Sequence, residues 1–298
     1  MLSYTGRRNL FGKLTNNSSS NNLSFGDTLM DSKTRELLGK RSWPFLKRTA
    51  TRSTSTANNY VLLPHNVRKV SNVTLTIGTT KYIVNEAPSR EFFDRVTATS
   101  LTGDILEWFY IIDSRLYFDK TPSTAGNTIT FTYKINYRDL TIADYTTGSI
   151  ITATNGGTAL VGDTTSWTAP MGGRWIRVTE SNTANTGDGE WYEVESITNG
   201  TTAVLVKPYN GTTITAGSAG YTLGQMSPLP DGYHEWPVYE ATSLYYAKTD
   251  QARSAYFKAE ADRLFAQMVS EFGSATDNLV IDNGEDYNQI NPNLTVQL

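Results

Sequence analysis

The sequence predicts an α+β protein. A helical subdomain built from both termini brackets a β-rich middle, which carries an inserted small β-barrel or sandwich. Three observations support this fold class. Apolar residues recur at helical spacing between residues 233 and 272. The middle of the chain alternates apolar and polar residues, as half-buried strands do. The region 144–225 is dense in Gly, Thr and Asn, with turn signals between short strand-like runs.

The helical run at 233–272 has two halves. From Asp250 onward it lacks Gly and Pro, and its apolar residues mark one face of a helix that ends at Gly273. At 1.5 Å per residue this helix would be roughly 33 Å long. The first half, 236–247, is aromatic on most sides, so we expect it to be buried. The predicted helical core consists of Leu29, Leu37, Trp43, Phe257, Leu264, Phe265 and Met268, with Leu29 and Leu37 packing on Leu264, Phe265 or Met268.

The N-terminal region supplies the partner for these helices. Its polar stretch Asn16–Asn22 predicts that residues 1–22 are mobile or ordered only by a partner. The sequence Ser24-Phe25-Gly26-Asp27 is typical of a capping box. It predicts a helix that ends at Gly39 and whose apolar face carries Phe25, Leu29, Lys33 and Leu37.

The β-rich middle divides into two parts. The first is expected to contain a short helix over 88–96 capped by Ser89, a tight hairpin at Asp113-Ser114, and strands at 49–56, 60–63, 70–77, 108–112, 115–119 and 128–137. The second is expected to contain strands at 149–154, 158–161, 174–179, 190–197, 202–207 and 220–223, as a small barrel or sandwich would. The resulting segments are 1–48 (N-terminal segment and helix), 49–140 (β-rich core), 141–227 (inserted β-module), 228–273 (C-terminal helices) and 274–298 (extended tail).

Composition excludes several classes of function. Charged residues make up 18% of the chain and the net charge is −3, so no bulk attraction to nucleic acid is expected. The absence of Cys excludes disulfides and thiolate chemistry, and two His make a histidine metal site improbable. We expect no cofactor and no metal. No apolar run approaches the length of a membrane span, and the N-terminus does not resemble a signal peptide.

Candidate sites each have a plain structural interpretation. Glu193 and Glu195 lie about 7 Å apart on one strand face, as in some glycosidases, but a solvated strand face is favoured because Tyr192 and Val194 alternate with them. Trp167, Trp175 and Trp191 would either fill the module core, which is favoured, or stack on a glycan. His65 and His234 are interpreted as ordinary partly buried residues. Basic residues in the first 52 positions are interpreted as solvent-facing, with contact to DNA or an acidic partner as the alternative. No catalytic residue emerges, and we expect no enzymatic activity.

Several short segments, in this order along the chain, are shared with one family. They are Arg41–Leu46, Tyr60–Pro64 with Val67–Val70, Glu107–Tyr110, Arg115–Phe118 with Thr121-Pro122, Phe131–Lys134, and the closing helices with Tyr245-Tyr246. With these segments the chain resembles the head-to-tail adaptor (connector) proteins of tailed bacteriophages over about residues 24–140 and 226–272. The segments Thr165–Trp167, Met171–Ile176 and Gly187–Val194 resemble a small β-module of phage structural proteins.

The resemblance implies a structural virion protein at the head–tail interface, made in the host cytoplasm. It implies a homo-oligomeric ring, a dodecamer, that docks under the portal protein, extends the DNA channel and provides the platform for tail attachment. The implied partners are the portal and tail proteins such as the tail tube, nozzle or fibres, with non-specific contact to DNA in the channel and none to a membrane. Two alternatives stay open: a tail-fibre or receptor-binding protein with a glycan-binding β-module, and a tail-tube or tail-completion protein.

The tail, residues 274–298, is too polar to fold alone, yet it carries isolated apolar residues that a partner surface can order. We therefore expect it to dock on the portal through Leu279, Val280, Ile281, Tyr287, Ile290, Leu294, Val296 and Leu298.

Overall fold

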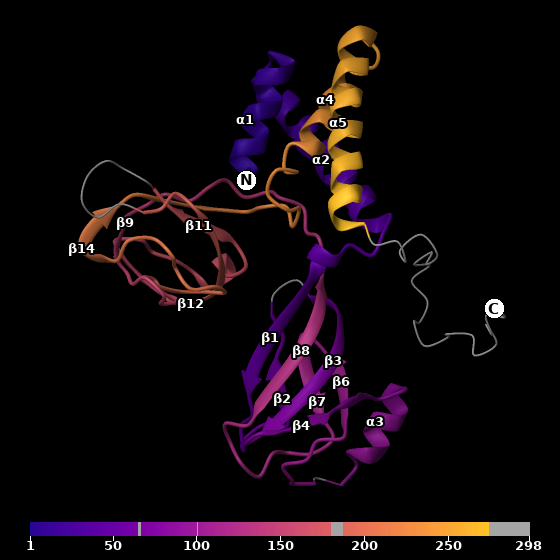
Figure 1. Cartoon of the computed structure of the whole chain (residues 1–298), viewed down its shortest axis with the longest axis vertical. Helices are drawn as coiled ribbons and strands as arrows, with labels where there is room; N and C mark the ends of the chain where they lie inside the picture. The colour runs from indigo at the N-terminus through magenta and orange to yellow at the C-terminus, as the bar shows by residue number, and fades with distance from the viewer. Residues whose placement is uncertain (65–66, 100, 180–186, 274–298) are drawn as a thin grey trace, which may run out of the picture.

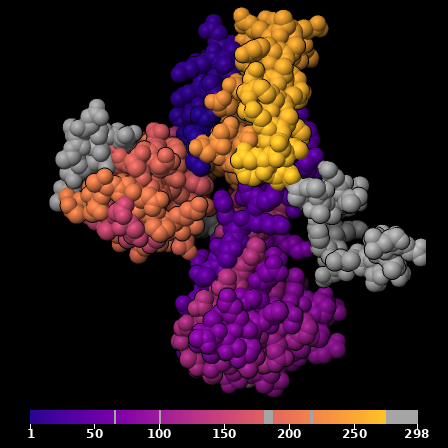
Figure 2. Space-filling view, viewed as in Figure 1, coloured from indigo at the N-terminus to yellow at the C-terminus, as the bar shows by residue number. Residues whose placement is uncertain are grey.

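The structure, a computed structural model, describes residues 1–64, 67–99, 101–179 and 187–273. Its fold is α+β, and helices from both ends of the chain bracket a β-rich middle, as the sequence predicts. Three lobes are visible in Figure 1: a helical lobe, a sandwich lobe and a β-module. In the space-filling view of Figure 2 the β-module projects to one side of the other two lobes.

The helical lobe joins the two ends of the chain. It consists of α1 (Tyr4–Thr15), α2 (Ser20–Gly39), α4 (Trp236–Tyr246) and α5 (Gln251–Phe272). Helix α4 contacts the other three helices, which explains why it is buried on most sides. Asp250 caps α5 by accepting the backbone N–H of Arg253 at 3.0 Å, so the chain turns sharply between α4 and α5.

The N-terminal polar stretch is a helix–helix turn, which differs from the expectation that residues 1–22 would need a partner for order. Asn16 adopts the left-handed conformation that ends α1, and the Ser19 side chain caps α2. The Asn22 side chain donates to Asn17 O at 2.7 Å and to Thr15 Oγ1 at 3.1 Å. Helix α2 therefore begins before the predicted capping box, and Phe25 is 50% exposed rather than on the buried face. Composition alone suggested disorder because these side chains are polar, whereas their hydrogen bonds to the backbone form the turn.

The sandwich lobe packs two four-stranded sheets around one core. One sheet has the order β1-β8-β3-β4 and the other β2-β7-β6-β5, with β5 and β6 parallel. Asp113 and Ser114 both have positive φ, which is the geometry of the predicted two-residue hairpin. The Ser89 side chain caps α3 (Arg90–Val96). The strands are β1 (Lys47–Ser53), β2 (Tyr60–Leu62), β3 (Val67–Ile77), β4 (Thr80–Ile83), β5 (Asn85–Glu86), β6 (Trp108–Ile112), β7 (Arg115–Phe118) and β8 (Thr128–Ile135).

The β-module is one curled sheet of seven strands with the order β14-β9-β10-β13-β12-β11-β15. Its inner face holds a separate hydrophobic core. Six strands were expected; β14 was missed because it has one large apolar residue, Ile214, and thus little alternation. The strands are β9 (Ser149–Ala153), β10 (Ala159–Asp163), β11 (Trp175–Val178), β12 (Trp191–Asn199), β13 (Thr202–Leu205), β14 (Ile214–Ala219) and β15 (Tyr221–Gly224).

Candidate functional site

A short aromatic segment, Trp43-Pro44-Phe45-Leu46, joins the helical lobe to the sandwich lobe, and we call it the hinge. Trp43 is buried, and its indole N–H donates to Leu37 O at 3.0 Å. Phe45 stacks on Trp43 with ring centroids 5.3 Å apart and meets the edge of Phe272 at 5.5 Å. Pro44 opens a 3-10 turn that leads directly into β1. The hinge is therefore fixed from both ends of the chain.

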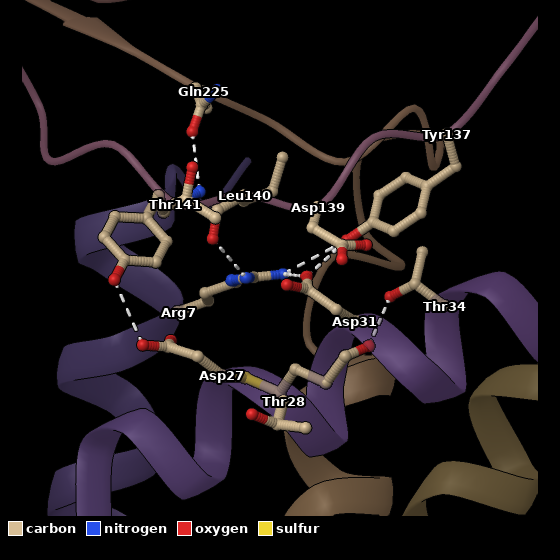
Figure 3. Close-up of polar contacts among 12 residues, drawn as sticks. Arg7, Asp27, Thr28, Asp31, Thr34, Tyr137, Asp139, Leu140, Thr141 and Gln225 are labelled. Carbon is tan, nitrogen blue, oxygen red and sulfur yellow. Dashed lines mark hydrogen bonds and ion pairs between the residues drawn. The ribbon is translucent and has the colours of Figure 1, made fainter. Parts of the chain in front are cut away.

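A buried ion pair lies where the helical lobe meets the segment that leads to the β-module (Figure 3). Arg7 Nη1 of α1 is 2.7 Å from Asp31 Oδ1 of α2, and both side chains are less than a tenth exposed, at 3% and 7%. Arg7 Nη2 donates to Leu140 O at 3.1 Å. The Tyr137 hydroxyl donates to Asp31 Oδ1 at 2.6 Å. Burial, together with the Asp31 carboxylate, raises the pKa of Tyr137, so this hydroxyl stays protonated and can donate.

The first residues of the chain hold the two connectors of the β-module together. The Tyr4 backbone N–H donates to Gln225 O at 2.8 Å, and Ser3 Oγ donates to Asp144 Oδ2 at 2.6 Å. The Gln225 side-chain oxygen in turn accepts the N–H groups of Thr141 and Ile142, both at 2.8 Å. Since 141–144 enters the module and Gln225 follows its last strand, the N-terminus ties the entry to the exit.

His234 completes this junction. Its ring is buried, with Nε2 2.8 Å from Leu229 O and Nδ1 3.3 Å from Leu2 O. The pKa of His234 is lowered, mainly by burial, and the positive charge of the Met1 ammonium lowers this pKa further. The ring is therefore neutral in the folded protein at neutral pH.

We expect acid to destabilise the fold through this residue. A histidine whose pKa is lowered on folding binds a proton more readily in the unfolded chain, so stability is lost as pH falls below about 6.5. The free energy of unfolding, followed by urea titration from about pH 7 to pH 5.5, should fall more steeply for the wild type than for His234→Gln. Equal slopes in the two proteins would contradict the assignment, whatever their absolute stabilities.

A cleft of about 700 Å³ opens between the sandwich lobe and the β-module. Two ion pairs cross it: Arg52 Nη1 to Glu195 Oε1 at 2.8 Å, and Arg48 Nη2 to Glu193 Oε2 at 3.8 Å. Burial raises the pKa of Glu193 despite the nearby Arg48. The long Arg48–Glu193 contact therefore offsets only part of the desolvation of this carboxylate.

The predicted acidic pair thus lies at a lobe interface. Tyr192 and Val194 are buried in the module core, as the alternation predicts. Glu195 is 39% exposed at its side chain and Glu193 only 26%, so Glu193 differs from the solvated residue that was expected. The sequence could not reveal that Glu193 is partly covered, because the strand that covers it, β1, lies more than a hundred residues earlier.

The three tryptophans of the module have different environments. Trp167 is in the core, and its indole N–H donates to the Tyr221 hydroxyl at 2.9 Å. Trp175 and Trp191 are half-buried on the outer face of the sheet. The Arg177 guanidinium lies 5.1 Å from the Trp191 ring centroid, while Trp175 lines the cleft. The core interpretation therefore fits Trp167 alone.

The residues assigned to the helical core occupy two clusters. One contains Leu37, Trp43, Leu264 and Met268, with Phe265 packed against it. Leu29 packs instead on a second cluster with Phe11 and Val238. Phe257 is buried on α5 and stacks on Tyr246 and Tyr239. The predicted docking residues lie outside the described residues, as does His65: Leu279, Val280, Ile281, Tyr287, Ile290, Leu294, Val296 and Leu298.

Within the described residues, no group of three or more His, Asp or Glu side chains is arranged to hold a metal ion. No helix in that same part of the chain is long and apolar enough to span a membrane. A scan against known protein families finds no match for this chain, and a search of the curated proteins finds none either.

Proposed function

We propose that this protein is a structural virion protein, a head-to-tail adaptor that docks as a ring under the portal of a tailed bacteriophage. In this role it extends the DNA channel and provides the platform for tail attachment. The observation that carries the proposal is the place of the family-like segments in the fold. They form the hinge, the strands of the sandwich lobe and the closing helix pair, which together make one frame.

The frame has the mechanical properties that a ring subunit needs. Helices α4 and α5 pack against each other, and Phe272 at the end of α5 contacts the hinge residue Phe45. Buried polar groups of the helical lobe hold the segment that leads to the β-module: Arg7 donates to Leu140 O, and Asp31 accepts from the Tyr137 hydroxyl. A load along such a subunit passes through packed elements rather than through a free linker.

Exposed apolar side chains on the helical lobe provide surface for neighbouring copies. Phe25 of α2 is 50% exposed, Leu244 of α4 is 42% exposed and Tyr256 of α5 is 61% exposed. Large aromatic residues are enriched at protein–protein interfaces. We assign these exposed side chains to contacts within the ring and the tail, 274–298, to the portal.

Truncation after Gly273 is expected to abolish assembly on portal rings. An extended 25-residue tail spans up to about 80 Å, enough to run along a neighbouring subunit. The measurement is co-sedimentation of the full chain and the truncated chain with the cognate portal, followed by electron microscopy. A second variant, in which Leu279, Val280 and Ile281 are replaced by Ser, keeps length and charge and should also lose docking. Unchanged affinity of both variants would assign docking to the helical lobe instead.

The same experiment separates the proposal from its alternatives. A tail-tube protein would polymerise into tubes without portal, and a glycan-binding fibre protein would bind sugars through Trp175 or Trp191 and ignore portal rings. An adaptor requires the portal to form its ring. Failure of the full-length protein to associate with portal under any salt condition would contradict the proposed function.

A further inference from the structure

The cleft between the sandwich lobe and the β-module contains an arginine whose charge has no partner among the described residues. Arg174 immediately precedes β11, lines the cleft and is only 8% exposed. Among the described residues, its guanidinium has no hydrogen bond or ion pair, and burial alone lowers its pKa. None of its guanidinium nitrogens is among the fully enclosed unpaired polar atoms of the described residues, so the charged end reaches the cleft. A mostly buried charge without a partner costs stability, so this arrangement points to a ligand that supplies the missing anion.

From this geometry we infer that the cleft is a binding site for an acidic peptide segment of a partner protein, with one carboxylate of the peptide paired to Arg174. A guanidinium presents parallel N–H donors that match the two oxygens of a carboxylate. This site is additional to the proposed docking of the tail on the portal and does not depend on it.

The charges around Arg174 favour a peptide carboxylate over a nucleic-acid backbone. The cleft wall carries Arg48, Arg52, Arg138 and Arg174 against Glu193 and Glu195, so it is basic in a chain whose net charge is −3. Glu193 and Glu195 already face Arg48 and Arg52, and they would repel a continuous row of phosphates. A single carboxylate brings less negative charge beside Glu193 and Glu195 than a row of phosphates does.

Arg48 offers a second point of contact. Its Nε is buried and has no hydrogen-bond partner, and its ion pair with Glu193 is long, at 3.8 Å. The Arg48 side chain is 32% exposed, so an incoming carboxylate can approach its terminal nitrogens without breaking a close pair. The two arginines come from β1 of the sandwich lobe and from the start of β11 of the β-module, so a bound peptide would bridge the lobes.

Apolar surface beside the arginines suits the side chains that flank the carboxylate. Trp175 is half-buried on the outer face of the module, and Val206 is 45% exposed. Both line the cleft, as does Pro170 of the 3-10 turn Ala169–Met171. The volume of the cleft, about 700 Å³, is within the usual range of ligand sites and can hold several side chains of a bound peptide. The expected ligand is thus an extended peptide in which one acidic residue is flanked by apolar residues.

The test uses the full chain and two labelled synthetic peptides of equal length, identical except that one has a single Glu and the other a single Gln at the centre of a run of Leu and Ser. Fluorescence anisotropy should show binding of the Glu peptide only. Arg174→Met should weaken that binding at least about tenfold, since it removes a charge-assisted, two-point contact. Arg263→Met changes an exposed arginine on α5, serves as the matched control and should bind like the wild type.

A thermal unfolding measurement distinguishes a ligand site from a structural arginine. Because the Arg174 charge has no partner in the part of the chain that the structure describes, Arg174→Met should raise the Tm of the unliganded protein by about 2 °C or more. The Glu peptide should raise the Tm of the wild type and leave that of Arg174→Met unchanged. A lower Tm for the variant, equal binding of the Glu and Gln peptides, or preferred binding of a labelled oligothymidylate would each overturn the inference.

Discussion

Replacement of Asp31 by Ala is expected to cost about 3–5 kcal/mol of unfolding free energy. The Asp31 carboxylate is the only anion in contact with the Arg7 guanidinium among the described residues, and both groups are buried where α1 and α2 meet. Its removal leaves a charge that water cannot reach and deprives the Tyr137 hydroxyl of its acceptor. The loss should appear as a lower urea midpoint in far-UV circular dichroism.

Two control variants separate burial from charge pairing. Asp94→Ala removes an exposed partner of Arg90 within α3, at 56% exposure, and should cost no more than about 0.5 kcal/mol. The double variant Arg7→Met with Asp31→Leu removes both charges and should recover most of the lost stability, since apolar residues often replace buried ion pairs without loss. If Asp31→Ala stays within about 1 kcal/mol of the wild type, the pair is not desolvated and the junction is not held as described.

Replacement of Leu264 by Asp is expected to cost several kcal/mol, because it buries a charge with no partner. Leu264 is 7% exposed on α5, in the cluster that also contains Leu37 and Trp43. The substitution therefore affects the packing of both chain ends and the hinge together. We expect loss of helical signal at lower urea, and earlier proteolysis of the helical lobe than in the wild type.

Leu244→Asp provides the comparison for Leu264→Asp. Leu244 is on the adjacent helix α4 and is 42% exposed, so its replacement should change stability by no more than about 0.5 kcal/mol. Similar losses for the two variants would show that helix propensity, rather than burial, determines the effect. A small loss for Leu264→Asp would mean that α5 separates from the N-terminal helices in solution.

Sequence patterns predicted the elements whose signals are local. Apolar spacing placed α5, and four residues of the predicted face are its buried positions: Phe257, Ala261, Leu264 and Met268. Tyr256, assigned to the same face, is 61% exposed. The strand β8 follows clean alternation, and Asp113-Ser114 forms the expected hairpin. The patterns failed where side-chain hydrogen bonds replaced apolar periodicity, as in the turn at Asn16–Asn22, and where a strand had few apolar residues, as in β14.

The sequence by itself determined the class of the fold, the helical subdomain built from both termini, and which residue types face inward. These follow from periodicity and capping, which act over a few neighbouring positions. Only the tertiary structure decided which polar groups meet. Arg7 pairs with Asp31 and contacts Leu140, Arg48 faces Glu193, and Arg174 is buried without an anion among the described residues. Such contacts depend on which elements lie side by side in the fold, and no local pattern encodes the desolvation that gives them their energy.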